Sequence, residues 1–471
     1  MPAPVAGAAT TDLLEAIDRL IADAGRRSRR TLVSATVEVD GVDPSAVAFA
    51  SRLASDRWFC WEQPDRDRFA IAGLGSAWEI VSRGGDRFAD LEHGCSEVSR
   101  GRVAVEPDEL PPGAGPVWVG GLAFAPDGGA APQWASLPPA LAVMPELSLS
   151  RSGAVSHLTL AGVVGPGRSA DQLRGRLRSR VEALRGGELP LLDPHPAGTT
   201  TIRSVRPPGS YEAAVAAATE LIREGGMEKI VLAREVVVEA PAAHDPGALY
   251  GGLRELFPSC FCFCVGTPEA AFLGASPELL VRRRGAVAAT AALAGSTRRS
   301  ADPAVDDHLG EQLARSAKDR HEHEIVVRRI ESALRPHSVW VEAAAEPVLV
   351  KVANIQHLAT PIHAQLSEPR SALELARMLH PTPAVGGEPR DAALAAIPRL
   401  EGMDRGWYAG PVGWMDTAED GELCVGLRSA LLRDRTAHLY AGGGIVSESD
   451  PAAELQEAEV KLEALLPLLA G

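Results

Sequence analysis

Short β-type segments, separated by turns rich in Gly, Pro and Asp, fill the sequence between residues 31 and 164. The last of them predicts a hairpin that turns near Ser152 and Gly153. Strand and helix patterns do not alternate in the regular way that parallel βαβ units require. We therefore expect an α+β fold with largely antiparallel sheets.

Helical periodicity is confined to a few segments and becomes more frequent in the second half of the chain. The predicted helices span residues 11–28, 169–186, 211–225, 305–335 and a final segment that begins at Pro451. Further strands are predicted at residues 229–238, 260–266, 271–283 and 286–294. The Pro-rich stretch 189–210 is the one clear linker. A chain of 471 residues can form two or three domains, or one large α/β unit.

Composition excludes several classes of protein. A net charge of −15 argues against nucleic acid or an anionic membrane surface as the main partner. No apolar run reaches the roughly 18 residues that a membrane-spanning helix needs. The N-terminal segment carries acidic residues and lacks a basic region before its apolar positions, so we expect a cytoplasmic protein. The six cysteines do not form a disulfide framework, and Cys260, Cys262 and Cys264 suit a buried strand better than a zinc site.

Lysine is scarce, because only four of the 47 basic residues are lysines. Arginine stays charged at any accessible pH, whereas a buried lysine can lose its proton and act as a base. The scarcity therefore draws attention to each lysine. Lys229 opens an apolar run, residues 229–238, that predicts a buried strand. Lys351 gives no such signal, and its retention by chance is equally compatible with the sequence.

Acidic residues recur at helical spacing on two segments. Glu454, Glu457 and Lys461 share one face of the final predicted helix, and Glu322 and Glu324 lie on the long helix before it. Taken alone, the final-helix stripe is better explained as a solvated face. Together, carboxylates from two helices could hold a hard cation such as Mg²⁺, which keeps positions open for substrate oxygens.

Two further features indicate recognition of an anion. The glycines at 442–444 would allow a ligand to approach the backbone closely and present several N–H donors to it. Arg428 could clamp a carboxylate in a bidentate manner. Combined with a buried lysine and a cation site, these features predict a pocket for a small molecule that carries several carboxylates.

Ordered blocks along residues 205–471 resemble the chorismate-utilising enzymes and, within them, the isochorismate synthases; a weaker resemblance runs through the N-terminal half. The blocks that carry the resemblance are 229–234 (KIVLAR), 272–278 (FLGASPE), 292–296 (ALAGS), 318–323 (KDRHEH), 357–361 (HLATP), 380–387 (HPTPAVGG), 408–414 (YAGPVGW) and 439–446 (LYAGGGIV). The resemblance implies a single large domain in which two packed antiparallel sheets are covered by helices. Residues 1–200 would form its N-terminal β-rich half and residues 201–471 its chorismate-binding catalytic half.

The resemblance also implies residue roles. Lys229 would be the base that activates water for attack at C2 of chorismate, and Glu278 the acid that protonates the departing C4 hydroxyl. Glu322 and Glu457 would bind Mg²⁺, with Glu454 nearby. The residues implied in substrate binding are Gly295, Ser296, Ala384, Arg428, Gly442 and Lys461.

Several alternatives stay open within the family. Lys229 in its KIVLAR context favours water over ammonia as nucleophile, and Pro383-Ala384-Val385 favours an isochorismate synthase over a salicylate synthase. The long N-terminal half resembles members of the menaquinone pathway more than those of siderophore pathways. A chorismate-binding protein without activity is disfavoured, because all of the implied catalytic and metal residues are present. We expect a monomer.

Overall fold

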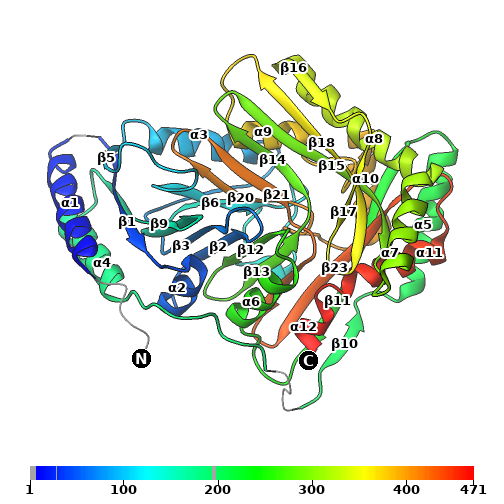
Figure 1. The fold of residues 1–471 in the computed structure, drawn as a ribbon, viewed down its shortest axis with the longest axis horizontal. Coiled ribbons are helices and arrows are strands. Elements are labelled where there is room, and N and C mark those ends of the chain that lie inside the picture. The colour runs from blue at the N-terminus through cyan, green and yellow to red at the C-terminus, as the bar shows by residue number, and fades with distance from the viewer. Residues whose placement is uncertain (1–6, 28, 194–197, 471) are drawn as a thin grey trace.

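Two large β-sheets packed face to face organise the computed structural model, which describes residues 7–27, 29–193 and 198–470 (Figure 1). Aromatic side chains fill the space between them; the rings of Phe69 and Trp414, one from each sheet, lie with centroids 5.9 Å apart. Within the described chain, β1 and β5 form the one parallel strand pair. The predicted α+β class, with largely antiparallel sheets in a single large domain, is confirmed.

The first sheet, sheet A, has 13 strands in the described chain and runs in the order β10-β11-β23-β22-β13-β12-β2-β3-β8-β9-β1-β5, with β19 beside β11. Its strands are β1 (Thr31–Asp40), β2 (Trp58–Gln63), β3 (Phe69–Leu74), β5 (Val103–Val105), β8 (Leu147–Ser152), β9 (Val155–Val164), β10 (Thr201–Ser204), β11 (Lys229–Glu239), β12 (Phe261–Gly266), β13 (Ala271–Ser276), β19 (Gly387–Glu388), β22 (Ser429–Arg433) and β23 (Thr436–Ile445).

The second sheet, sheet B, has 10 strands in the same described ranges and runs in the order β16-β18-β15-β14-β21-β20-β6-β7-β4, with β17 beside β18. Its strands are β4 (Trp78–Ser82), β6 (Val117–Leu122), β7 (Ala140–Met144), β14 (Leu279–Arg284), β15 (Val287–Arg298), β16 (Ser338–Ala343), β17 (Val348–Lys351), β18 (Ile355–Leu366), β20 (Pro411–Asp416) and β21 (Gly421–Val425). Both sheets take strands from both sides of the Pro-rich stretch, so the two sequence halves share one core.

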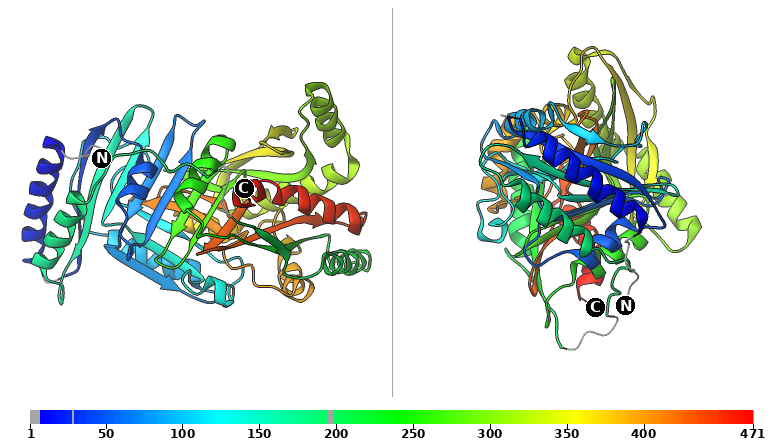
Figure 2. Two further views of the ribbon diagram at one scale, coloured as in Figure 1. Left: turned by 90° about the horizontal axis from the view of Figure 1, so that it is seen from below. Right: turned by 90° about the vertical axis from the view of Figure 1, so that its left-hand side faces the viewer.

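Helices cover the outside of the sheets (Figure 2). They are α1 (Ala8–Ala24), α2 (Pro44–Ser51), α3 (Arg87–Ser99), α4 (Ala170–Glu182), α5 (Pro208–Arg223), α6 (Pro246–Leu256), α7 (Pro303–Arg315), α8 (Ala317–Leu334), α9 (Ala372–Leu379), α10 (Arg390–Glu401), α11 (Pro451–Leu462) and α12 (Leu466–Ala470). Helices α1 and α4 lie at one end of the molecule, and α5, α7, α8, α10 and α11 gather at the other (Figure 1). Across the described residues, none of these helices is long and apolar enough to span a membrane.

Three predicted elements differ from the structure. The expected strand 271–283 is two strands in different sheets, because Pro277 lacks the backbone N–H that a continuous strand would use and the chain crosses there from sheet A to sheet B. The expected helix 305–335 is two helices, since Ser316 is extended (φ −66°, ψ 119°) and caps α8 through the Asp319 N–H. The stretch 189–210 contains β10 and the start of α5; its residues 194–197 lie outside the described ranges.

Other local signals are confirmed. The final helix begins where predicted, since the Asp450 carboxylate accepts a hydrogen bond from the Ala453 N–H at 2.9 Å and Pro451 occupies the first helical position. Cys260, Cys262 and Cys264 are all buried, as expected for a strand in the core.

Candidate active site

A pocket of about 710 Å³, its open mouth included, lies at the end of the molecule where β11, β23, β15, α8 and α11 meet. Two of the eleven predicted site residues, Lys229 and Glu454, do not line it. The nine that do are Glu278, Gly295, Ser296, Glu322, Ala384, Arg428, Gly442, Glu457 and Lys461. Segments far apart in the sequence thus meet in one cavity.

Lys229 lies directly behind the pocket wall. It is the first residue of β11 and is fully buried, with its Nζ 2.9 Å from Glu322 Oε1. The contact does not have the angular geometry of a hydrogen bond, so the amine has no hydrogen-bond partner in the protein. A Cβ at Gly444 would lie 2.8 Å from Lys229 Cε and 2.1 Å from Glu322 Oε1. Glycine at 444 therefore lets this buried pair approach the pocket.

Glu278 follows Pro277 at the crossing between the two sheets. Two hydrogen bonds hold its backbone. The Glu278 N–H donates to Ser276 Oγ at 3.2 Å, and the Glu278 carbonyl accepts from the Val425 N–H at 3.0 Å. Burial raises the pKa of the Glu278 carboxyl to about 8, although the charge of Lys229 acts in the opposite direction. At neutral pH this residue is a protonated acid that faces the pocket.

Three lysines pair with the three carboxylates predicted to bind metal. Besides the contact of Lys229 with Glu322, Lys318 Nζ donates to Glu454 Oε1 at 2.8 Å, and Lys461 Nζ lies 2.6 Å from Glu457 Oε1. Each carboxylate predicted to bind metal thus has one lysine amine beside it. Three of the chain's four lysines are therefore used at one site.

Burial and neighbouring charges shift the pKa values of the two glutamates of α11 in opposite directions. Burial disfavours the charged form of Glu457, but the charge of Lys461, together with hydrogen bonds from Lys461 and Ser296, outweighs it and lowers the pKa to about 2. Burial and the adjacent Glu457 charge raise the pKa of Glu454. Glu457 is thus an ionised carboxylate beside a more easily protonated one.

The donor chemistry around Gly443 suits a hard cation, since Mg²⁺ prefers carboxylate oxygens. A Cβ at Gly443 would lie 3.0 Å from Glu454 Oε2 and 3.7 Å from Glu457 Oε1, so both carboxylates face the same glycine. In the part of the chain that the structure describes, however, no three acidic, His or Cys side chains are grouped as metal ligands. Each of the three carboxylates instead contacts a lysine amine. Magnesium binding stays a prediction.

Gly295 and Ser296 reach the pocket through a β-bulge. The pairing of β15 with β18 shifts register between Ala294 and Ser296, and Gly295 has φ +76°, a conformation that favours glycine. The Ser296 hydroxyl donates to Glu457 Oε1 at 2.7 Å. The bulge therefore brings a short piece of backbone to the pocket and helps to orient the carboxylate of α11.

Arg428 supplies a buried cation with an unused donor. Its Nη2 lies 3.1 Å from His357 Nε2, and its Nη1 has no partner in the protein. Burial and then the Arg428 charge lower the pKa of His357 well below its usual value, so that the neutral imidazole can accept this hydrogen bond. Arg428 has φ +47°, which is rare outside glycine and typical of functional sites. The free Nη1 is well suited to a substrate carboxylate.

The remaining predicted contacts lie on β23 and α11. Lys461 Nζ donates to the Gly442 carbonyl at 2.8 Å, which joins the helix to the strand. A Cβ at Gly442 would come within 1.9 Å of the Leu232 carbonyl, so only glycine fits beside β11 there. Ala384 lines the pocket together with Val385.

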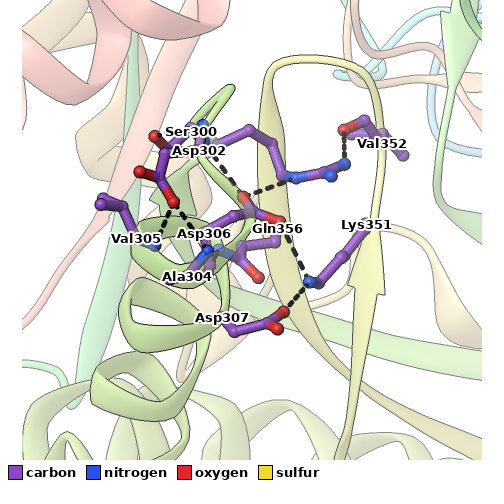
Figure 3. Close-up of polar contacts among 10 residues, drawn as sticks. Ser300, Asp302, Ala304, Val305, Asp306, Asp307, Lys351, Val352 and Gln356 are labelled. Carbon is purple, nitrogen blue, oxygen red and sulfur yellow. Dashed lines mark hydrogen bonds and ion pairs between the residues drawn. The ribbon is translucent and has the colours of Figure 1, made fainter.

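The fourth lysine, Lys351, does not reach this pocket. Its Nζ donates to Asp306 at 3.0 Å and to Asp307 at 2.7 Å, and Asp306 also accepts hydrogen bonds from Arg299 and the Ser300 N–H (Figure 3). This cluster ties the start of α7 to the end of β17 and the end of β15. Lys351 has a structural contact and not a place in the pocket.

Several pocket residues were not among the predicted site residues. His357 and Tyr408 stand inside the sequence blocks that carried the resemblance, so those blocks could have indicated them. Lys318 does not line the pocket but contacts Glu454, and its place in the KDRHEH block could have indicated it. Arg405 also lines the pocket, and no feature of the sequence singled it out.

Comparisons with known proteins agree with this geometry. Residues 17–470 match the family model described as "Chorismate binding enzyme", and the chain belongs to that family. It is 37% identical over 461 residues to the "Salicylate biosynthesis isochorismate synthase" of Pseudomonas aeruginosa, with 96% of this chain and 93% of the relative covered. It is 30% identical over 447 residues to the "Isochorismate synthase MenF" of Bacillus subtilis, with 93% and 94% covered.

The fold is also that of a solved family member. The structure of MenF, the menaquinone-specific isochorismate synthase from Escherichia coli, superposes with a TM-score of 0.78 at 27% identity, and the match covers 98% of this chain and 100% of that one. The family resemblance inferred from the sequence blocks is confirmed.

Proposed function

We propose that this protein is an isochorismate synthase, which converts chorismate to isochorismate. The observation that carries the proposal is a protonated acid in the pocket wall, Glu278, together with a buried amine directly behind the wall, Lys229, that has no hydrogen-bond partner. Exchange of a hydroxyl across a conjugated ring needs both an acid and a base. The similarity to isochorismate synthases along almost the whole chain supports the same reaction.

In the proposed reaction, water adds at C2 of chorismate and the C4 hydroxyl is displaced. Neutral Lys229 accepts a proton from water while the water oxygen bonds to C2. The C1=C2 and C5=C6 double bonds shift to C1=C6 and C4=C5, and the C4–O bond breaks. Glu278 donates its proton to the departing hydroxyl, which leaves as water. Exchange with solvent then restores the neutral amine and the protonated acid.

The charges around the pocket suit a dicarboxylate. The unpaired Nη1 of Arg428, the ammonium of Lys461 and the backbone at Gly295-Ser296 are the donors available to it. Mg²⁺ would be held by Glu322 and Glu457, with Glu454 nearby, and would neutralise substrate charge. The two charges of a divalent cation would offset those of a dianionic substrate.

We further propose that isochorismate is released without conversion to salicylate. Elimination of pyruvate requires the enolpyruvyl side chain to fold over the ring, where it would receive the C2 hydrogen. Ala384 and Val385 offer no polar side chain to this corner of the pocket that could hold such a pose.

The metabolic role we propose is in menaquinone biosynthesis, on the basis of the long N-terminal half. The match extends over the full length of the menaquinone-specific enzyme. It extends almost as fully over the salicylate-pathway relative, so length alone does not separate the two roles.

Incubation with chorismate, with and without Mg²⁺, followed by separation of the products tests the proposal. We expect Mg²⁺-dependent formation of isochorismate that stops at an equilibrium mixture. Ammonium salt in a parallel reaction should give no amino product. Stoichiometric salicylate and pyruvate would contradict the product proposed here, and unchanged chorismate would contradict the activity itself.

A further inference from the structure

Strand β11, which carries Lys229, lacks a continuous neighbour on one side. The opposite side is paired with β23 along its length from Ile230. On the open side, β10 pairs only with 236–239, while β19 pairs with Lys229 and Ile230 and the Val231 N–H donates to the Gly386 carbonyl. Between these two partners, the backbone N–H and C=O groups of β11 must form hydrogen bonds with groups other than a neighbouring strand.

Two side chains fill this gap. Arg405 Nη2 donates to the Val231 carbonyl at 2.9 Å, and the Ala233 N–H donates to Glu401 Oε1 at 2.7 Å. Arg405 and Glu401 are themselves joined, with Arg405 Nε 3.0 Å from Glu401 Oε2 and Nη2 2.5 Å from Oε1. Together the pair offers β11 one donor and one acceptor, as a neighbouring strand would.

The same arginine also contacts the segment of the pocket wall that contains Ala384 and Val385. Its Nη1 donates to the Val385 carbonyl at 2.8 Å, so one guanidinium bridges β11 and the segment that presents Ala384 and Val385 to the pocket. Arg405 is 4% exposed and stacks over Phe124 with 4.2 Å between guanidinium carbon and ring centroid. A planar guanidinium can make these contacts at once, and an ammonium cannot.

We infer that Arg405, held by Glu401, is a positioning residue that fixes the Lys229 end of β11 against the 382–387 segment of the pocket. Its effect on catalysis rests on the proposed role of Lys229. Although Arg405 lines the pocket, its guanidinium donates to Glu401 and to the Val231 and Val385 carbonyls, so it acts on the base through the strand. Its effect on the strand does not depend on that role. A buried ion pair that only stabilised the fold would have neither effect.

A second buried arginine provides the matched control. Arg180 donates to both oxygens of Asp56, at 2.6 and 2.9 Å, and to Glu146 at 3.1 Å. Like Arg405 it is almost fully buried, but it lies on α4 at the other end of the molecule. Arg180→Lys should therefore lower the melting temperature as Arg405→Lys does, without reaching the pocket.

Hydrogen–deuterium exchange tests the strand directly. Peptides covering 229–235 and 382–388 should exchange about tenfold faster or more in Arg405→Lys than in the unmodified protein, and at the unmodified rate in Arg180→Lys. If Arg405→Lys does not fold, Glu401→Gln should show the same local change, because it removes the charge that holds Arg405. Unchanged exchange in both peptides would overturn the inference, whatever the protein's activity.

Kinetics of isochorismate formation test the catalytic consequence. Displacement of a base by about 1 Å can cost about a hundredfold, so kcat of Arg405→Lys should fall about ten- to a hundredfold while KM changes less than about threefold. Arg180→Lys should keep both kcat and KM. A raised KM with unchanged kcat would assign Arg405 to substrate binding, and equal losses in Arg180→Lys would reduce its role to stability; either result overturns the inference. If the unmodified enzyme forms no isochorismate, the proposed function fails, and the exchange experiment alone decides the role of Arg405.

Discussion

The pKa of Glu278, raised to about 8 by burial, sets a quantitative expectation for the pH dependence of the reaction. The proposed acid must be protonated, so its contribution is complete well below pH 8 and is lost as the pH rises through that value. With a pKa of about 8, about nine tenths of the carboxyl is protonated at pH 7 and about one tenth at pH 9. The high-pH limb of kcat/KM should therefore fall about tenfold between these two values.

Initial rates of isochorismate formation across this pH range, at subsaturating chorismate, measure the fall of kcat/KM at high pH. This fall reports the ionisation of the free enzyme. Glu278→Gln should lower kcat by about 10²- to 10⁴-fold and abolish the limb, because the amide cannot give up a proton in place of the acid. Asp416→Asn is the matched control, since burial, followed by the Asp420 charge, raises the pKa of Asp416 to about 6 outside the pocket. A limb that persists in Glu278→Gln, or that disappears in Asp416→Asn, would refute the assignment of Glu278 as the acid.

Five further substitutions test the other groups of the site. Lys229→Arg should lose activity almost as fully as Lys229→Ala, because Arg keeps its proton at working pH; a rate above about a tenth of the unmodified enzyme would contradict a general base here. Glu322→Gln and Glu457→Gln should each weaken Mg²⁺ binding, measured by calorimetry, in a protein whose circular dichroism is unchanged, and undiminished affinity in both would remove these carboxylates from the metal site. Arg428→Lys should raise KM about tenfold or more through the loss of a charge-assisted hydrogen bond, whereas an unchanged KM would show that this guanidinium does not bind substrate.

Lys229 was predictable because lysine is scarce in this chain and this one opens an apolar run. Where arginine serves as the general cation, a lysine marks a position where an ammonium or a neutral amine is needed. Lys229, Lys318 and Lys461 each pair with one of the three glutamates that the sequence indicated. The helical spacing on α11 and the glycines of β23 also led to residues that lie at the pocket.

Other features depend on contacts that no local pattern reveals. Arg405 is one of many arginines, and only the gap beside β11 gives it a distinct role. The crossing of the chain at Pro277 from one sheet to the other looks in the sequence like an irregularity within one strand, yet it places Glu278 at the pocket. The extended residue Ser316, which ends α7 and starts α8, is likewise hidden within a continuous helical pattern. Tertiary packing decides all three.

The central claim is that a base activates water at C2 while an acid releases a different oxygen from C4. The most direct measurement is the reaction of chorismate in ¹⁸O-labelled water, with mass spectrometry of isochorismate collected before equilibrium is approached. We expect one ¹⁸O atom in each product molecule, at the C2 hydroxyl. Product that carries only the original, unlabelled hydroxyl would contradict the claim, because the oxygen would then have migrated within the substrate without the water that Lys229 is proposed to activate.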